Sequence, residues 1–325
     1  MRESEDPVVD AEDSDVSPPA WQDLMQQLYR IIAEQGDGKC LAWINPANGD
    51  PELGEGSEPA RVIVPINHRA FDQRFAPYLV ELDLSRFADD QYFQDSVAMA
   101  WTAWSQPLLA AQRGQPVCGW ILTDTAASEV ARYWANQCHL HVISGQTRLL
   151  RFHDPGVREM LWNDLNDIQR QHLLRPVNTV LAIDRHYELM RHDTPAIRSY
   201  PDDVARPIHP STFRLDEDQW KRVADYVTLH AAWVYGLSEG TLPRSRRIDG
   251  NVRASMAAAG SYGLQSEGDR MLFALLALRI GGAFHTDARL TEVWRLTAEQ
   301  ESLADAMEQV FHLPTEELIN FLSSS

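Results

Sequence analysis

Apolar residues recur along this chain with two different periods, and the arrangement changes near residue 190. Before that point, short apolar runs alternate with segments in which apolar residues return every three to four positions. The short runs predict strands at 40–44, 61–66, 78–84, 117–122, 139–143, 147–152 and 177–183. The longer segments predict helices at 21–34, 91–113 and 126–137. Helices alternating with strands predict an α/β lobe with a mixed sheet over residues 21–190.

The pattern after residue 190 predicts a connector followed by helices. Residues 191–214 contain Pro195, Pro201, Pro207 and Pro210, which exclude a continuous helix and predict an extended connector. Residues 215–325 predict an all-helical lobe, with helices at 217–237, 253–259, 268–280, 288–296, 298–313 and 316–322. The run 271–278 is apolar almost all round, so its helix is expected at the centre of this lobe. Thr297 is expected to cap the helix that begins at 298.

Residues 149–155 (Leu-Leu-Arg-Phe-His-Asp-Pro) form the most informative local motif. They predict a strand that ends in a helix cap, with Asp154 accepting the free N–H groups of the first turn. Pro155 then occupies the first helical position, where its missing donor costs nothing. Arg151 is expected to complete a structural clamp by bonding loop carbonyls or a carboxylate. The helix should continue through Val157, Leu161, Leu165 and Ile168.

Three segments in the same order carry a resemblance to a known family. They are 149–177, with an Arg-Phe-x-Asp-Pro core and a Leu-Arg-Pro-Val ending, 76–82 (Ala-Pro-Tyr-Leu-Val-Glu-Leu), and 262–281. Together they resemble the adaptor chaperones of the bacterial type VI secretion system, catalogued as domain of unknown function 4123. The resemblance implies a protein that loads toxic effectors onto the VgrG spike, without a cofactor.

The charge of the chain limits the classes of partner. The formal net charge is −18, with 47 acidic residues against 29 Lys and Arg. So acidic a chain repels phosphate backbones, which argues against nucleic acid as a partner. Residues 1–20 contain seven of the acids and one Arg, and they predict a disordered acidic tail. The chain has no signal-peptide pattern and no apolar run near the ~20 residues that span a bilayer, which predicts a cytoplasmic protein without a membrane partner.

The candidate catalytic and metal-binding residues are few. Ser261 lies in Ala-Gly-Ser-Tyr-Gly, which resembles a nucleophile elbow, but an elbow requires a preceding strand and residues 254–259 are helical in pattern. His139 and His141 share one face of a predicted strand, without a third ligand at a recognisable spacing. Cys40, Cys118 and Cys138 have no paired spacing and are expected to be buried thiols. We therefore predict no catalytic residue, no metal site and no cofactor.

Two groups of residues are candidates for partner binding. Arg244, Arg246, Arg247 and Arg253 form a basic cluster in an acidic chain. The cluster could dock an acidic partner segment, or it could be a solvated loop. Aromatic residues anchor interfaces, so any exposed Trp on a helix would mark a contact surface. The candidates are Trp220, Trp233 and Trp294.

These observations favour a non-enzymatic adaptor that binds the N-terminal region of one effector and helps to load it onto the VgrG spike. Two alternatives remain open. An immunity-type protein could cover the basic active site of a toxin with its acidic surface. A cryptic serine hydrolase would use Ser261.

Overall fold

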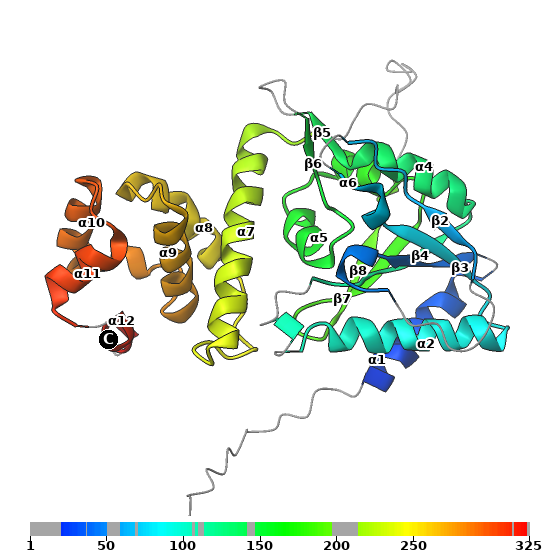
Figure 1. Cartoon of the computed structure of the whole chain (residues 1–325), viewed down its shortest axis with the longest axis horizontal. Helices are drawn as coiled ribbons and strands as arrows, with labels where there is room; N and C mark the ends of the chain where they lie inside the picture. Colours follow the sequence, from blue (N-terminus) through cyan, green and yellow to red (C-terminus); the bar gives the residue numbers. More distant parts are fainter. Residues whose placement is uncertain are drawn as a thin grey trace, which may run out of the picture.

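The computed structural model describes residues 21–36, 38–50, 59–68, 71–105, 108–109, 114–141, 147–196, 214–313 and 315–323. Helix α7 (Glu217–Ser238) stands between an α/β lobe and a group of helices (Figure 1). This arrangement confirms the predicted fold class. The predicted acidic tail, the hairpin turn at 144–146 and most of the predicted connector (197–213) lie outside the described residues.

The α/β lobe is built on a six-stranded sheet in the order β2-β3-β1-β4-β7-β8. The strands are β1 (Lys39–Ile44), β2 (Arg61–Ile63), β3 (Tyr78–Leu82), β4 (Val117–Thr123), β7 (Thr179–Ile183) and β8 (Leu189–Asp193). Each pair of neighbours is antiparallel, whereas the sequence predicted a mixed sheet. The reason is that β3 and β4, which α2 connects, both pair with β1, so β1 separates the two strands that run the same way.

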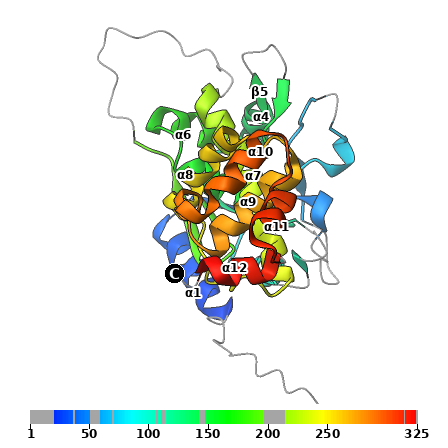
Figure 2. The same cartoon turned by 90° about the vertical axis from the view of Figure 1, so that its left-hand side faces the viewer.

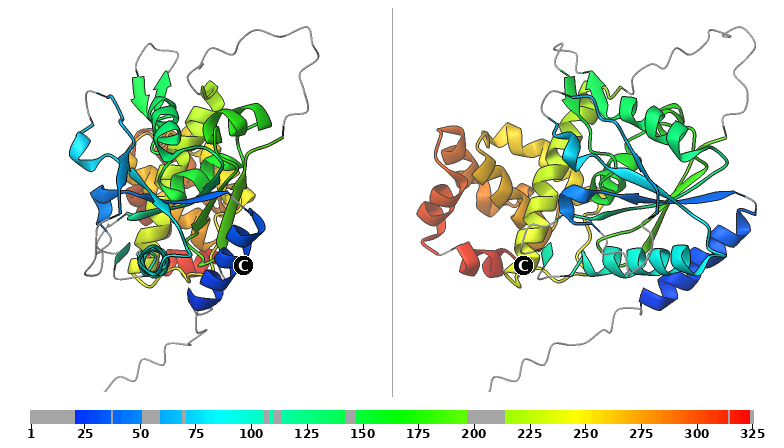
Figure 3. Two further views of the ribbon diagram at one scale, coloured as in Figure 1. Left: turned by 90° about the vertical axis from the view of Figure 1, so that its right-hand side faces the viewer. Right: turned by 45° about the vertical axis from the view of Figure 1, so that its right-hand side comes forward.

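Side chains of the sheet alternate between two helical layers. In β1, Cys40 and Ala42 pack with α1 (Trp21–Glu34) and α2 (Phe87–Thr102). Leu41 and Trp43 point to the other face. That face is covered by α4 (Ala127–Gln137), α5 (Pro155–Trp162) and α6 (Asp167–Leu174), as Figure 3 shows. The predicted hairpin is present as a separate pair, β5 (His139–His141) and β6 (Thr147–Leu149).

The helical region packs around one buried helix. Helix α9 (Glu267–Arg279) is buried from Phe273 to Leu278, which confirms its predicted central position (Figure 2). The surrounding helices are α8 (Gly250–Ala259), α10 (Thr291–Ala298), α11 (Leu303–Phe311) and α12 (Thr315–Ser323). Short 3₁₀ turns join or precede helices, among them η4 (Gly260–Tyr262) and η6 (Ala288–Leu290).

Several predicted boundaries were wrong. Helix α2 occupies 87–102, not 91–113. The helix that begins at Pro155 stops at Trp162, and α6 starts anew because Asn166 and Gln169 form a capping box. Thr297 lies inside α10, where its hydroxyl donates to the Tyr262 carbonyl at 2.8 Å, while Ser302 caps α11. Strand β8 was not predicted at all.

At Gly119 the backbone of β4 lies close to β7. Its φ is 139°, and a Cβ atom there would lie 2.1 Å from the Leu181 carbonyl oxygen of β7. The β1–β4 register also shifts opposite this glycine, between Trp43 and Ile44. Only a residue without a side chain fits both the backbone conformation and the neighbouring strand.

We expect Gly119→Ala to destabilise the chain by about 3 kcal/mol, because backbone strain and overlap with β7 add. Gly240 is the matched control, since its φ is also positive (66°) but a Cβ atom there would meet nothing within 4 Å. Gly240→Ala should cost only about 1 kcal/mol. Urea unfolding of both variants measures the difference, and equal losses would show that the β4–β7 approach is not constrained.

Candidate functional site

The Asp154-Pro155 cap has the predicted geometry. Asp154 Oδ1 accepts the backbone N–H of Gly156 at 2.9 Å and that of Val157 at 3.4 Å. Pro155 is the first residue of α5. The short range of these contacts is the reason that the local sequence was sufficient to predict them.

Arg158, not Arg151, binds the carbonyl groups of the motif. Arg151 is exposed, whereas Arg158 is fully buried. Arg158 Nη1 donates to the carbonyls of Phe152 and His153 at 3.1 and 3.2 Å, and Nη2 donates to the Cys118 carbonyl in β4 at 2.6 Å. One guanidinium therefore ties the motif to the central strand of the sheet.

The surroundings of Arg158 are aromatic and dry. Its guanidinium lies 5.4 Å from the Trp43 ring centroid, and Trp43 in turn lies 4.1 Å from Trp134. Burial lowers the pKa of Arg158 to about 10, so the group still carries its charge at neutral pH. Burial, with Arg151 and Arg158 adding to it, lowers the pKa of His153 to about 3, so that ring is neutral. The motif is thus part of the core.

A signal for Arg158 was present in the sequence. It lies three residues before Leu161, on the apolar face of the predicted helix. A charged residue on an apolar face has to find internal acceptors, since its burial otherwise carries a large desolvation cost.

The arginine cluster lies against the turn that joins β7 to β8. Arg244 Nη2 donates to the Trp104 carbonyl at 2.6 Å, and Nη1 donates to the Arg185 carbonyl at 3.0 Å. Its guanidinium lies 4.6 Å from the ring centroid of Tyr187, which stacks on Trp101. Tyr187 has a positive φ of 62°, an uncommon conformation for a residue with a side chain.

A second arginine, Arg185, links the same turn to α7 and α5. Its Nε donates to Glu159 Oε2 at 3.1 Å, and its guanidinium lies 5.3 Å from the Trp233 ring. Trp233 donates its Nε1 hydrogen to the Arg246 carbonyl at 3.0 Å. Residues 184–188 and 244–247, with Trp233 packed against both, form a region that we call the joint. It fastens the loop after α7 to the α/β lobe.

Two of the other three arginines of the cluster also have side chains that contact their own chain, while Arg246 contributes its carbonyl to Trp233. Arg247 forms a 2.5 Å ion pair with Glu188, with both side chains more than half exposed. Arg253 lies over the ring of Tyr226 at 4.8 Å. The cluster therefore has a structural role that the sequence did not predict. Its contact with a partner remains a prediction.

The three candidate tryptophans differ in burial. Trp233 is fully buried between the lobes and presents no surface to a partner in this conformation, contrary to its selection as a contact residue. Trp220 is half-buried and packs on the α4–α6 side of the α/β core. Trp294 is also half-buried, stacked on Tyr262 at 4.4 Å with its Nε1 hydrogen on the His285 carbonyl.

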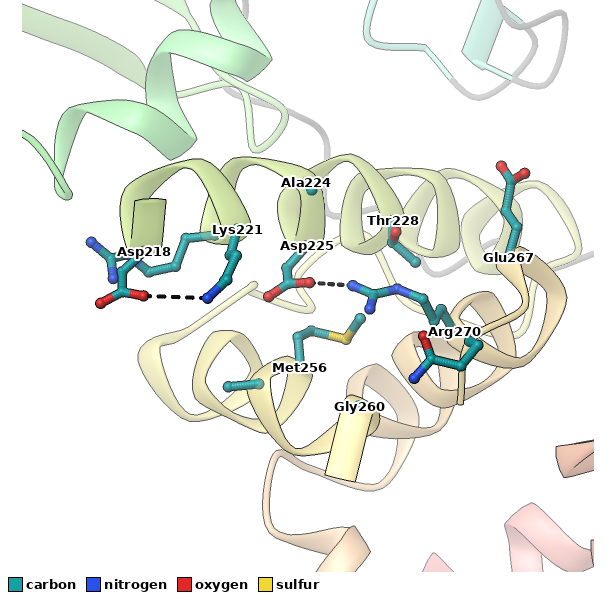
Figure 4. A pocket seen from close by; sticks show the side chains of 12 residues that line it. Asp218, Lys221, Ala224, Asp225, Thr228, Met256, Gly260, Glu267 and Arg270 are labelled. Atoms are coloured by element: carbon teal, nitrogen blue, oxygen red, sulfur yellow. Dashed lines mark hydrogen bonds and ion pairs between the residues drawn. The ribbon is translucent and has the colours of Figure 1, made fainter. Parts of the chain in front are cut away.

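A groove of about 700 Å³ lies in the helical region (Figure 4). Its walls are α7, α8 and the first turns of α9, and Asp225 of α7 bonds Arg270 of α9 inside it. Burial outweighs Arg270 and raises the pKa of Asp225. A second cavity of about 330 Å³ shares Arg222, Asp225 and Ala257 with the groove and extends it toward Asp164 of the α/β lobe. No sequence motif marked this groove.

The candidate catalytic serine and the three cysteines make contacts that are typical of structural residues. Helix α8, not a strand, precedes Ser261, and the Ser261 hydroxyl donates to the Ala258 carbonyl at 2.6 Å. Cys40, Cys118 and Cys138 are buried free thiols, and burial raises the pKa of each. Within the described ranges, no three His, Cys, Asp or Glu side chains gather as a metal site would require. Among the described residues, no helix combines the length and the hydrophobicity needed to cross a bilayer.

We expect Arg158→Leu to cost about 3 kcal/mol or more, because three buried carbonyls lose a charged donor. Arg151→Ala, in the same motif but exposed, should change stability by no more than about 0.5 kcal/mol. Asp154→Ala should cost about 1 kcal/mol through the lost cap. Chemical denaturation of the three variants tests this order, and an Arg151 loss as large as that of Arg158 would contradict it.

The joint predicts a difference between two neighbouring arginines. Arg244→Ala removes two hydrogen bonds from a charged group and a cation–π contact, so we expect a loss of about 2–3 kcal/mol. Arg247→Ala removes only an exposed ion pair and should cost under about 1 kcal/mol. Limited proteolysis should also cut the loop between α7 and α8 faster in Arg244→Ala. Equal stability and equal cleavage in both variants would argue against the joint.

Comparison with known proteins gives one match. Residues 69–172, about a third of the chain, match the family model described as "Domain of unknown function (DUF4123)". Neither the curated proteins nor the solved structures yield a match to the chain. The matched residues run from the turn before β3 to α6, so they contain α2, β4, the hairpin and the whole Arg158 motif. This part of the α/β lobe is thus similar to the DUF4123 family.

Proposed function

We propose that this chain is a non-enzymatic, cytoplasmic adaptor chaperone of a type VI secretion system. It binds the N-terminal region of one cognate effector and helps to load that effector onto the VgrG spike. The observation that carries the proposal is the DUF4123 match over residues 69–172. The match covers one of the three segments that resemble effector-loading adaptors, 76–82, and most of a second, 149–177, while the third at 262–281 lies beyond it.

The architecture supports a role in holding a partner. Arg185 and Arg244 fasten the helices to the α/β lobe, so the outer faces of these two parts keep a fixed orientation relative to each other. An adaptor must hold its cargo during handling and release it on loading. This requirement corresponds to a moderate interface, roughly 1,200–2,000 Å² of total buried surface, rather than an obligate one.

The net charge of −18 favours one second candidate, an immunity-type inhibitor. Such a protein covers the active site of its toxin, and an acidic surface suits a basic active site. The two functions differ in where the partner is bound. An adaptor binds the delivery region and leaves the toxic domain active, whereas an inhibitor binds the toxic domain.

Capture experiments with divided effector separate these functions. The neighbouring genes are searched for a candidate toxin, and the chain is co-expressed with it as the whole protein, as its N-terminal half and as its toxic half. We expect capture of the whole protein and of the N-terminal half, retained toxic activity, and association of the captured complex with VgrG. Capture by the toxic half alone, with loss of activity and no spike association, would identify an inhibitor.

Ser261→Ala tests the non-enzymatic part of the proposal. Ser261 is exposed and its hydroxyl donates to a carbonyl of the preceding helix α8, so its removal should leave stability within about 0.5 kcal/mol and capture unchanged. The purified chain is also assayed with p-nitrophenyl esters. Ester hydrolysis that Ser261→Ala abolishes would overturn the assignment as a non-enzyme.

A further inference from the structure

The groove between α7 and α8 is lined in part by small residues. Ala224 of α7, Ala257 of α8 and Gly260 of the following turn line it, together with Met256 (Figure 4). Small side chains let a partner backbone come close to both helices. The walls are helices whose backbone groups are bonded internally, so the groove has no free strand edge for an extended segment to pair with.

An exposed apolar stripe on α7 continues beside the groove. Its residues are all exposed and follow one another at spacings of three, four and four positions: Ala224, Val227, Ala231 and Tyr235. Val227 and Tyr235 are 60% and 50% exposed, high for large apolar side chains. This spacing is the surface that one helix offers to another in ridges-into-grooves packing.

The charges of the groove are arranged unevenly. Its internal cations are paired within the chain, Arg222 with Asp164 at 3.2 Å and Arg270 with Asp225. At the two ends lie exposed carboxylates, Asp218 and Glu267. Asp218 shares Lys221 with Glu217 at 3.7 and 3.6 Å, so two carboxylates meet one ammonium there. A partner cation at each end would complement these carboxylates, and the net charge of −18 attracts such a partner over longer range.

We propose that the groove seats an amphipathic α-helix of the effector, with a face of small apolar residues and a Lys or Arg near each end. The proposal rests on the adaptor function and adds the surface and the chemistry of the bound segment. The apolar face of the helix covers Ala224 and Ala257 and the stripe on α7. Its terminal cations meet Asp218 and Glu267.

The test uses the full chain and the neighbouring-gene toxin as the probe. Ala257→Trp fills the groove, and Ala304→Trp is its matched control, since Ala304 is an exposed alanine on α11 outside the groove. The double variant Asp218→Lys, Glu267→Lys reverses the charge at both ends of the groove. Its control is Glu308→Lys, a single charge reversal at an exposed position on α11 outside the groove. Circular dichroism and melting of every variant show that the fold is intact.

We expect Ala257→Trp to weaken capture about tenfold or more and the double charge reversal to weaken it about fivefold in low salt. The effect of charge reversal should shrink in 0.5 M NaCl, because salt screens ionic contacts between exposed groups. Both controls should bind as the unmodified chain does. A photo-crosslinking residue at position 224 or 257, but not at 304, should attach to an effector segment that is helical as a free peptide in trifluoroethanol and has basic ends.

Three results would overturn the inference. Unchanged capture by the folded groove variants, with the unmodified chain still binding the N-terminal half, would reject the groove and leave the adaptor function standing. Cross-links between two copies of this chain, or to an extended segment, would reject the helical occupant. Failure of the unmodified chain to capture the toxin at all would reject the proposed function and, with it, this site.

Discussion

Helix α7 is the element on which both halves of the molecule depend, because it is packed on two sides at once. Trp233 meets Arg185 of the α/β lobe, while Leu275 of α9 packs on the other side next to Gly236. Gly236 shows how tight the second contact is, since a Cβ atom there would lie 3.1 Å from a methyl group of Leu275 on α9. A helix enclosed in this way leaves only a narrow outward strip. The residues of that strip are therefore the ones free to serve another molecule.

The features that the sequence predicted are those set by neighbours in the chain. The Asp154-Pro155 cap depends on N–H groups two and three residues away, and the strands and the central helix follow from local periodicity. Strand β8 escaped because it is an edge strand with Arg191 and Asp193 exposed, which removes the apolar signal. The break before α6 escaped because Leu165 keeps the helical period through a turn that Asn166 ends.

The roles of the arginines could not be predicted, because their acceptors are distant in the sequence. Arg244 bonds carbonyls 59 and 140 residues away, and Arg158 bonds one 40 residues away. Composition showed a basic cluster and suggested a partner surface. Tertiary structure adds an intramolecular role by offering backbone carbonyls and aromatic rings, to which a planar guanidinium binds well. For the same reason the groove was invisible, since α7, α8 and α9 meet only in the fold.

The distribution of charge then acquires a physical meaning. Arg158, Arg185 and Arg244 direct their charge inward to carbonyls, a carboxylate and aromatic rings of the same chain. Many carboxylates, such as Asp218 and Glu267, remain on the surface. In the proposed adaptor, a partner that approaches this surface would be guided by charge, which mainly sets the rate and specificity of association, and would be retained by apolar fit along α7. Because charge at the rim contributes little to residence time, the strength of binding depends on a small apolar contact. A small contact of this kind can be broken when the cargo is handed on, which a larger apolar interface would prevent.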